Sequence, residues 1–263
     1  METYEERLEL HDPLSLSQQS ALTISHHDYK QFLSRIVKAY DSSVIRAYCK
    51  VRFTIMNINI LHILSLCLRG KQRVLDVGCG FGLFGCYFSA LYPEISYVGY
   101  DLDPRRVEMA NRAAKHLGLR NAMFRCGDAR QLSIDEQFDA VLMVDLLHHI
   151  NADAKQKLLT TCAEHLAPDG RLIIKDVTTH PFLKIGFTWA LDVLMTRGLE
   201  MWYWNEQTFC EVLERHFNRV DTFPISDWLP YPHIVYLCEN SPLPNLKQDL
   251  ADRTLNEEGG DLA

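Results

Sequence analysis

The sequence predicts an α/β fold built on a mostly parallel, doubly wound sheet. Short apolar segments that suit buried strands alternate with longer segments of helical periodicity from about residue 70 to residue 177. A glycine-rich turn joins the first strand to its helix, and at such a turn the backbone can approach a ligand closely. Strand, helix and strand in this succession imply right-handed βαβ units.

These patterns place the individual elements. Apolar segments predict strands at 74–77, 97–100, 123–126, 138–144, 171–177, 219–225 and 233–238, the last two as an antiparallel hairpin. Helical periodicity predicts helices at 83–91, 105–117, 152–166 and 208–217. A Pro-Asp-Gly turn at 168–170 is expected to precede the fifth strand.

Composition and charge narrow the class of protein. Of the 263 residues, 47% are hydrophobic and 23% are charged, as in a soluble globular protein with one domain of about 200 residues and additions. The net charge is −7 and no dense run of Lys or Arg occurs, so electrostatic binding to nucleic acid is not expected. The eight cysteines lie singly and the acidic N-terminus does not resemble a signal peptide, which favours a cytoplasmic protein without a metal site.

Segments outside the alternating pattern predict additions to the fold. Residues 1–27 are predicted to form an irregular N-terminal arm, and residues 240–263 a disordered acidic tail. Apolar residues at helical spacing between 28 and 69 predict two or three helices that pack against the sheet or cap the ligand pocket. An apolar, aromatic insertion at 178–204 needs a burial partner of its own: these helices, an apolar substrate, or a membrane surface or second subunit reached through 182–204.

The segment Val74 to Gly82, V-L-D-V-G-C-G-F-G, carries the most information about a ligand. Its glycines allow a sharp turn, and the helix that follows offers unpaired N–H groups at its start. Asp76 is a carboxylate late in an otherwise apolar strand, so it is expected to meet a hydrogen-bond donor or a cation. The glycines at 80, 82 and 85 also fit G-x-G-x-x-G, the fingerprint of an NAD-dependent oxidoreductase, and this alternative has to be decided by the rest of the chain.

Asp101 stands at the end of the second predicted strand. A carboxylate at this place in a doubly wound sheet can accept hydrogen bonds from a ribose diol. Either Asp101 or Asp103 could instead cap the helix that begins at Pro104. We assign Asp103 to the cap and Asp101 to the ribose.

The order of these segments resembles the class I (Rossmann-like) S-adenosylmethionine-dependent methyltransferases. Val74–Gly82 is similar to motif I of that family, D/E-x-G-x-G-x-G, and Y-D-L-D-P, G-D-A, F-D-A-V and L-A-P-D-G-R-L-I-I follow in family order. The resemblance is close over 70–177 and looser to about 239, whereas a chance dinucleotide fingerprint predicts none of the later motifs. It implies a methyltransferase domain at 70–239 with seven strands in the order 3-2-1-4-5-7-6, the last strand antiparallel.

The resemblance also implies how S-adenosyl-L-methionine would bind as the cofactor. Asp76 would lie near its amino group, the glycine loop would approach the methionine moiety, and Asp128 would accept from the adenine amino group, with the backbone of Ala129 near the ring. The implied cofactor-binding residues are Asp76, Gly78, Cys79, Gly80, Gly82, Asp101, Leu102, Asp128, Ala129 and Asp145.

The end of the fourth strand bears on the reaction. Family members that methylate amide or base nitrogens commonly carry Asn/Asp-Pro-Pro-aromatic there, and this chain has Asp145-Leu146-Leu147-His148 instead. Leu-His-His is similar to the variant in many small-molecule and lipid methyltransferases. His148 takes the place of the aromatic residue and suits a proton acceptor, with His149 as a second catalytic candidate. A histidine here could instead bond only to the backbone, and Asp176 could contact the acceptor or pair with a neighbouring Lys or Arg.

We therefore predict a methyltransferase that acts on oxygen or carbon of an apolar or aromatic small molecule, or of a lipid or polyketide-like intermediate. The helices at 28–69 and the insertion would together enclose this acceptor. The alternatives are an RNA or protein methyltransferase and a non-catalytic interaction protein that binds S-adenosylmethionine, because fold alone does not establish function.

Overall fold

The computed structural model describes residues 26–131, 136–177, 202, 205–225 and 233–240. The predictions for the arm at 1–27, the insertion at 178–204 and the tail at 240–263 therefore lie almost entirely outside the described residues. Trp202 is the main exception, because its backbone and side chain are both described. Any contact made through 182–201 remains a prediction.

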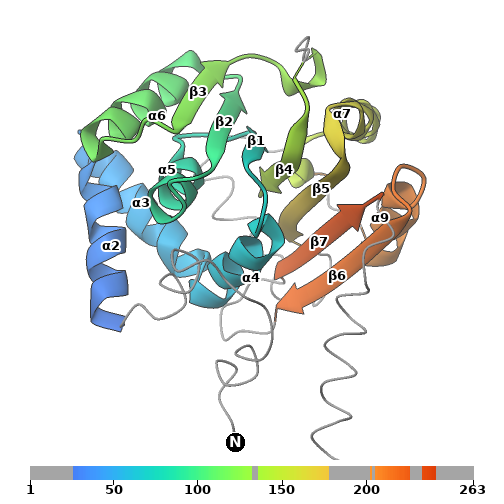
Figure 1. Ribbon diagram of the computed structural model, residues 1–263, viewed down its shortest axis with the longest axis horizontal. Coiled ribbons are helices and arrows are strands. Elements are labelled where there is room, and N and C mark those ends of the chain that lie inside the picture. Colours follow the sequence, from blue (N-terminus) through green and yellow to red (C-terminus); the bar gives the residue numbers. More distant parts are fainter. Residues whose placement is uncertain (1–25, 132–135, 178–201, 203–204, 226–232, 241–263) are drawn as a thin grey trace, which may run out of the picture.

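The described residues form one seven-stranded sheet in the order β3-β2-β1-β4-β5-β7-β6, which confirms the predicted order (Figure 1). All pairings are parallel except those of β7, which runs antiparallel to both β5 and β6. The strands are β1 Arg73–Val77, β2 Ser96–Asp101, β3 Ala122–Cys126, β4 Phe138–Val144, β5 Leu166–Val177, β6 Arg219–Ile225 and β7 His233–Glu239.

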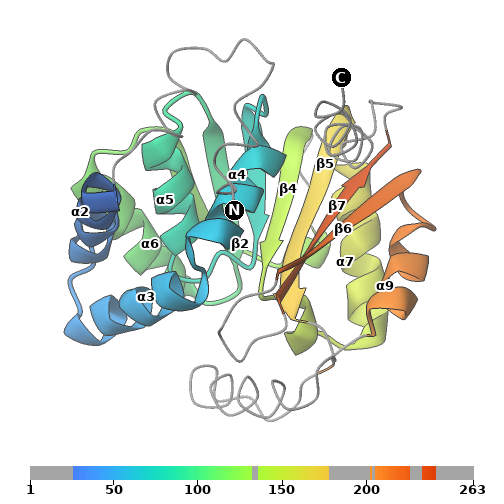
Figure 2. The same cartoon turned by 90° about the horizontal axis from the view of Figure 1, so that it is seen from below.

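Helices cover both faces of the sheet (Figures 1 and 2). Alternate side chains of the strands point to opposite faces, so the sheet separates two apolar cores. Val74 and Leu142 face the larger core, whereas Leu75 and Val141 face the smaller one. The larger core is covered by α2 His26–Lys38, α3 Ser43–Ile55, α4 Ile58–Leu68, α5 Leu83–Leu91 and α6 Pro104–Leu117, and the smaller one by α7 Ala152–Glu164 and α9 Glu206–Leu213.

Local sequence explains where these helices begin. The Asp103 side chain accepts from the backbone N–H of Arg105 with Pro104 in the first turn, which confirms the assignment of Asp103 to the cap of α6. Asn205 caps α9 in the same way. Gly118, at φ 72°, ends α6 in the left-handed conformation that glycine adopts without strain.

The start of the fifth strand differs from the prediction. A turn at 168–170 was expected, but β5 already begins at Leu166, and α7 ends at Glu164. Phe138 pairs with Leu166 and Ala140 pairs with Arg171, so the register shifts between the two pairs. Residues 167–170 thus form an irregular bulge in β5. The strand is paired with β4 before the bulge, at Leu166, and again after it, at Arg171.

Two further findings apply to the described residues only. No single helix there is long and apolar enough to cross a membrane, and α3 and α4, which reach that composition together, bend by 81° between them. No group of three or more His, Cys, Asp or Glu side chains is placed to hold a metal ion in this part of the chain.

Candidate active site

The loop between β1 and α5 exposes its backbone at one glycine and packs tightly at another. Gly78, Gly80 and Gly82 all have positive φ, at 77°, 55° and 70°, a conformation that favours glycine. A Cβ added at Gly80 would have no atom of the described residues within 4 Å, whereas one at Gly82 would lie 2.6 Å from Ala110 Cβ. The loop is therefore open to a ligand at Gly80, and Gly82 serves the packing of α5 against α6.

The third glycine of the alternative dinucleotide fingerprint also serves packing. Gly85 lies inside α5, where an added Cβ would come within 2.7 Å of the Phe124 and Tyr97 rings. The Cys79 side chain is also closely packed, against the backbone of Gly99 in β2. A Cβ added at Gly99 would lie 2.8 Å from Cys79 Cβ. Burial raises the pKa of the Cys79 thiol, so this thiol is kept neutral.

Asp101 fixes the glycine loop to the end of β2. Its carboxylate accepts from the backbone N–H of Gly80 at 2.9 Å and from that of Asp103 at 2.9 Å. The N–H groups of Gly78 and Cys79 both donate to the Tyr100 carbonyl, at 2.8 and 3.0 Å. The structure therefore brings together Gly78, Cys79, Gly80 and Asp101, with the exposed side chain of Leu102 beside them.

Asp76 is buried beneath this loop. It accepts a hydrogen bond of 2.8 Å from the Tyr97 hydroxyl, which confirms the expectation that a donor would meet it. Burial raises the pKa of Asp76 to about 7 even though the Tyr97 hydrogen bond lowers it. Tyr97 was predicted only as a strand residue, because nothing in a β-strand pattern shows which inward side chain meets a buried carboxylate.

The predicted adenine contact already has a partner within the chain. Both carboxylate oxygens of Asp128 accept from the guanidinium of Arg130, at distances down to 2.6 Å. The hydrogen bonds from Arg130 lower the pKa of Asp128. Ala129 is buried and begins the short 3-10 helix η2, Ala129–Gln131. Since a carboxylate has more than two acceptor sites, Asp128 can still accept from a second donor.

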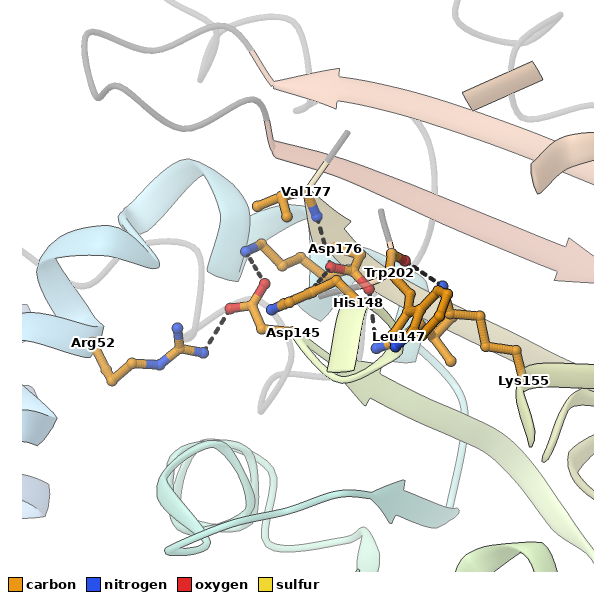
Figure 3. Close-up of polar contacts among 9 residues, drawn as sticks. Arg52, Asp145, Leu147, His148, Lys155, Asp176, Val177 and Trp202 are labelled. Carbon is orange, nitrogen blue, oxygen red and sulfur yellow. Dashed lines mark hydrogen bonds and ion pairs between the residues drawn. The ribbon is translucent and has the colours of Figure 1, made fainter. Parts of the chain in front are cut away.

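Asp145 follows β4 and is bound by two cations. Its carboxylate contacts Arg52 Nη2 of α3 at 2.7 Å and Lys175 Nζ of β5. Burial alone would raise the pKa of Asp145, but Lys175 and Arg52 hold it well below the usual range. Asp145 has φ 51°, a sparsely populated conformation for a residue other than glycine. Figure 3 shows Arg52 reaching across from α3 to the ends of β4 and β5.

The two histidines occupy the 3-10 helix η3, Leu147–His149, directly after Asp145. His148 is buried, and its Nδ1 lies 2.5 Å from Asp176 Oδ1. Asp176 also accepts from the backbone N–H groups of Leu147 and Val177, at 3.1 and 2.8 Å. The ring of the half-buried His149 lies 4.0 Å from that of His148, centre to centre. Asp176 therefore pairs with His148 (Figure 3), the partner that the sequence did not identify.

Burial and ion pairing oppose each other at Asp176. Burial alone would raise its pKa, but the adjacent His148 lowers it below the usual value. Asp176 is thus held as a carboxylate next to the imidazole. A carboxylate on Nδ1 orients the ring and stabilises the protonated form, which makes the histidine a better proton acceptor.

Lys155 of α7 completes this cluster, although it was not predicted as a site residue. Its buried Nζ donates to the Trp202 carbonyl at 2.5 Å, and the Trp202 N–H donates to the His148 carbonyl at 2.7 Å. Burial lowers the pKa of Lys155 to about 8. A signal was available: Lys155 shares the spacing of the buried residues Leu158, Leu159 and Cys162, which places it on the inward face of the helix.

These side chains border a small cavity of about 20 Å³. His148, Lys155, Asp176 and Trp202 line it together with apolar residues. Such a volume holds about one water molecule. The cluster is therefore closely packed, and a larger acceptor would have to lie beside it rather than within it.

Comparison with known proteins identifies relatives of part of the chain. Residues 74–170 match the family described as "methyltransferase domain". A ubiquinone biosynthesis O-methyltransferase of Cereibacter sphaeroides is 32% identical over 135 residues, 49% of this chain and 52% of that protein. A tRNA (guanine-N(7)-)-methyltransferase of Rubrobacter xylanophilus is 42% identical over 67 residues, 25% of this chain and 30% of that protein. The chain thus spans about half, or less, of these relatives.

Solved structures share the fold. The YcgJ protein of Bacillus subtilis is 25% identical with a TM-score of 0.51, over 64% of this chain and 70% of that one. The S-adenosylmethionine-dependent methyltransferase SibL has a TM-score of 0.61 at 16% identity, over 85% of this chain and 72% of that one. At that identity the likeness to SibL concerns the fold alone.

Proposed function

We propose that the chain is a class I S-adenosylmethionine-dependent methyltransferase and that it methylates an oxygen or carbon atom of an apolar small molecule. The acceptor would be an aromatic compound or a lipid or polyketide-like intermediate. The observation that carries the proposal is the buried His148–Asp176 pair directly after β4. An acceptor hydroxyl or acidic carbon must lose a proton during methylation, and this pair can take it.

The residues around the glycine loop fit S-adenosyl-L-methionine. When bound, it supplies an electrophilic methyl group on a sulfonium. The open backbone at Gly80 would face the methionine moiety, because none of the described residues places an atom within 4 Å of a Cβ added there. The Asp101 carboxylate would accept from the ribose, and the exposed side chain of Leu102, at 66% accessibility, would cover the nucleoside. Asp76 and Asp128 retain the roles that the resemblance implies.

His148 is the proposed proton acceptor. With Nδ1–H directed to Asp176, its Nε2 is the nitrogen that takes the proton, and the ionised Asp176 stabilises the imidazolium that results. The half-buried ring of His149 lies 4.0 Å from that of His148, centre to centre, and we assign it a contact with the acceptor rather than the proton transfer. Asp145 is proposed to hold α3 over the site through Arg52.

The likeness to a ubiquinone biosynthesis O-methyltransferase supports the choice of oxygen. The likeness to a tRNA (guanine-N(7)-)-methyltransferase favours a second candidate, methylation of an RNA base. Against it stand the net charge of −7 and the short matched segment, which covers 30% of that protein. We also propose a cytoplasmic location, supported by eight cysteines that are all free thiols.

Calorimetric titration followed by transfer assays tests the proposal. We expect S-adenosylmethionine and S-adenosylhomocysteine to bind and NAD not to bind. Labelled methyl groups should then appear on prenylated or alkylated phenols and not on tRNA. Transfer to tRNA that persists at moderate salt, or binding of the sulfur ligands without transfer to any acceptor class, would replace the proposal with one of its alternatives.

A further inference from the structure

An apolar stripe runs along the outer side of α3. Val44 and Val51 are 73% and 44% exposed, Ala47 between them is exposed, and Ile58 at the start of α4 is 51% exposed. Residues 44, 47 and 51 share one face of the helix by their spacing. The opposite face, with Cys49 and Phe53, is buried in the larger core. Thus α3 is apolar on two faces, and the described residues cover only one of them.

The charge around this stripe is positive. Within α3 there are three basic residues, Arg46, Lys50 and Arg52, and no acidic one. Of these, Arg52 is paired with Asp145, and Arg46 donates to the backbone carbonyls of residues 40 and 41. From α2 to α4, residues 26–68 contain six Lys or Arg and two Asp, in a chain whose net charge is −7. Lys50 is exposed beside the stripe. The N-terminal helices therefore form a basic region on an acidic protein.

The stripe also lies at the edge of the sheet that carries the candidate active site. Tyr48 packs its ring on Phe81 of the glycine loop, with ring centres 5.3 Å apart, and Arg52 binds Asp145. Figure 2 shows α3 at the end of the sheet to which the arrowheads of β4 and β5 point. Thus α3 contacts both the glycine loop and the residue that follows β4, and the exposed stripe lies on this same helix.

We propose that the α3 stripe, defined as Val44, Ala47 and Val51 with Lys50, binds the surface of an anionic lipid bilayer. A helix with an apolar face and basic residues beside it binds at the bilayer interface through apolar burial and attraction to anionic headgroups. A symmetric contact with a second copy fits less well, because it would bring the basic residues of both copies together. This contact goes beyond methyl transfer and uses residues other than those at 182–204.

Vesicle flotation with the full chain tests the proposal. We expect binding to vesicles of phosphatidylglycerol and phosphatidylcholine, and loss of binding with phosphatidylcholine alone or at high salt. Val44→Ser with Val51→Ser should weaken binding about tenfold by removing buried apolar area. Lys50→Glu should weaken it by a similar factor of about ten through its two units of charge. The matched control is Met123→Ser, since Met123 is 50% exposed in β3 and is not part of the α3 stripe.

The outcomes separate the proposal from its rivals. Unchanged flotation of the double variant, or an equal loss for Met123→Ser, would overturn it. A dimer of the wild-type chain that the double variant converts to a monomer, without vesicle binding by either, would assign the stripe to contact between copies. Titration with S-adenosylhomocysteine on the same samples checks that each variant is folded. Because flotation measures lipid binding and the titration measures binding at the proposed cofactor site, failure of one proposal is distinguished from failure of the other.

Discussion

The glycine loop and the end of β4 lie at the same edge of the sheet but are built from different interactions. In the glycine loop, carboxylates accept from backbone N–H groups and a tyrosine hydroxyl, and Asp76 and Asp101 come from the neighbouring strands β1 and β2. At the end of β4, carboxylates pair with cations and a histidine from α3, β5 and η3. The first region is held by local geometry, and the second by charges from distant parts of the chain.

This difference predicts which substitutions should affect catalysis and which should affect ligand binding. A loop fixed by backbone hydrogen bonds changes little when a single side chain is replaced, except for a side chain that also contacts the ligand. A cluster of buried charges is different, because removal of one member leaves another without its partner. Variants in the two regions should therefore affect different measurements, and four predictions test that separation.

The largest effect is expected at His148. His148→Ala should lower kcat by about 10²- to 10⁴-fold, the usual contribution of a general base, while binding of S-adenosylhomocysteine stays within about threefold. His149→Ala, the adjacent control, should lower kcat by less than about tenfold because His149 is not the proposed base. The pH dependence of kcat on a phenolic acceptor is the deciding readout. If His148→Ala retained the wild-type pH profile, the proton would be taken elsewhere.

The next largest effect is expected on cofactor binding. Asp101→Ala should weaken binding of S-adenosylmethionine by about ten- to a hundredfold, since it removes charge-assisted hydrogen bonds of about 1.5–3 kcal/mol. Asp103→Ala is the matched control two residues away. It should leave the Kd nearly unchanged but lower the free energy of unfolding by about 1 kcal/mol through loss of the α6 cap. Equal weakening by both variants in calorimetry would mean that Asp101 acts only by holding the loop.

A smaller effect is expected on stability from the ion pair that connects α3 to β4. Arg52→Met should lower the free energy of unfolding by about 1–3 kcal/mol, because the buried Asp145 loses one of the two cations, Arg52 and Lys175, that bind its carboxylate. Arg112→Met, which breaks exposed contacts to Asp41 and Glu108, should cost less than about 1 kcal/mol. Urea unfolding monitored by circular dichroism measures both. A cost for Arg112→Met equal to that for Arg52→Met would remove the distinction between the two regions.

The same distinction explains how far the sequence could predict the structure. The strand order, the loop glycines and the Asp103 cap are local patterns or follow from a familiar order of motifs, and the structure agrees with them. The partners of Asp145 and Asp176 are 93 and 28 residues distant in the chain, at Arg52 and His148. No periodicity encodes such a pairing, because it depends on how β4, β5 and α3 meet in space. The bulge at 167–170 was not predicted either, because a Pro-Asp-Gly segment suits a turn and an irregular strand equally well.

The fourth prediction concerns pH and has opposite signs in the two regions. Burial raises the pKa of Asp76 to about 7, so the folded state keeps a proton that the unfolded chain loses near pH 4. The contribution of Asp76 to stability therefore falls as the pH rises from about 4 to 7, by at most about 1.4 kcal/mol per pH unit. The cations around Asp145 lower its pKa, so its contribution is present at neutral pH and is lost as the pH falls below about 4.

Two variants separate these contributions. Asp76→Asn should remove the first contribution. The free energy of unfolding of the wild type minus that of the variant should therefore decrease as the pH rises from 5 to 7. Asp145→Asn should show no such shift in that range, and its cost should instead shrink on acidification toward pH 3. Urea unfolding at pH 3, 5 and 7 measures each difference relative to wild type, which cancels the other titrating groups. Parallel pH dependences for the two variants would show that the two carboxylates lie in electrostatically similar surroundings, contrary to the contacts that the structure gives them.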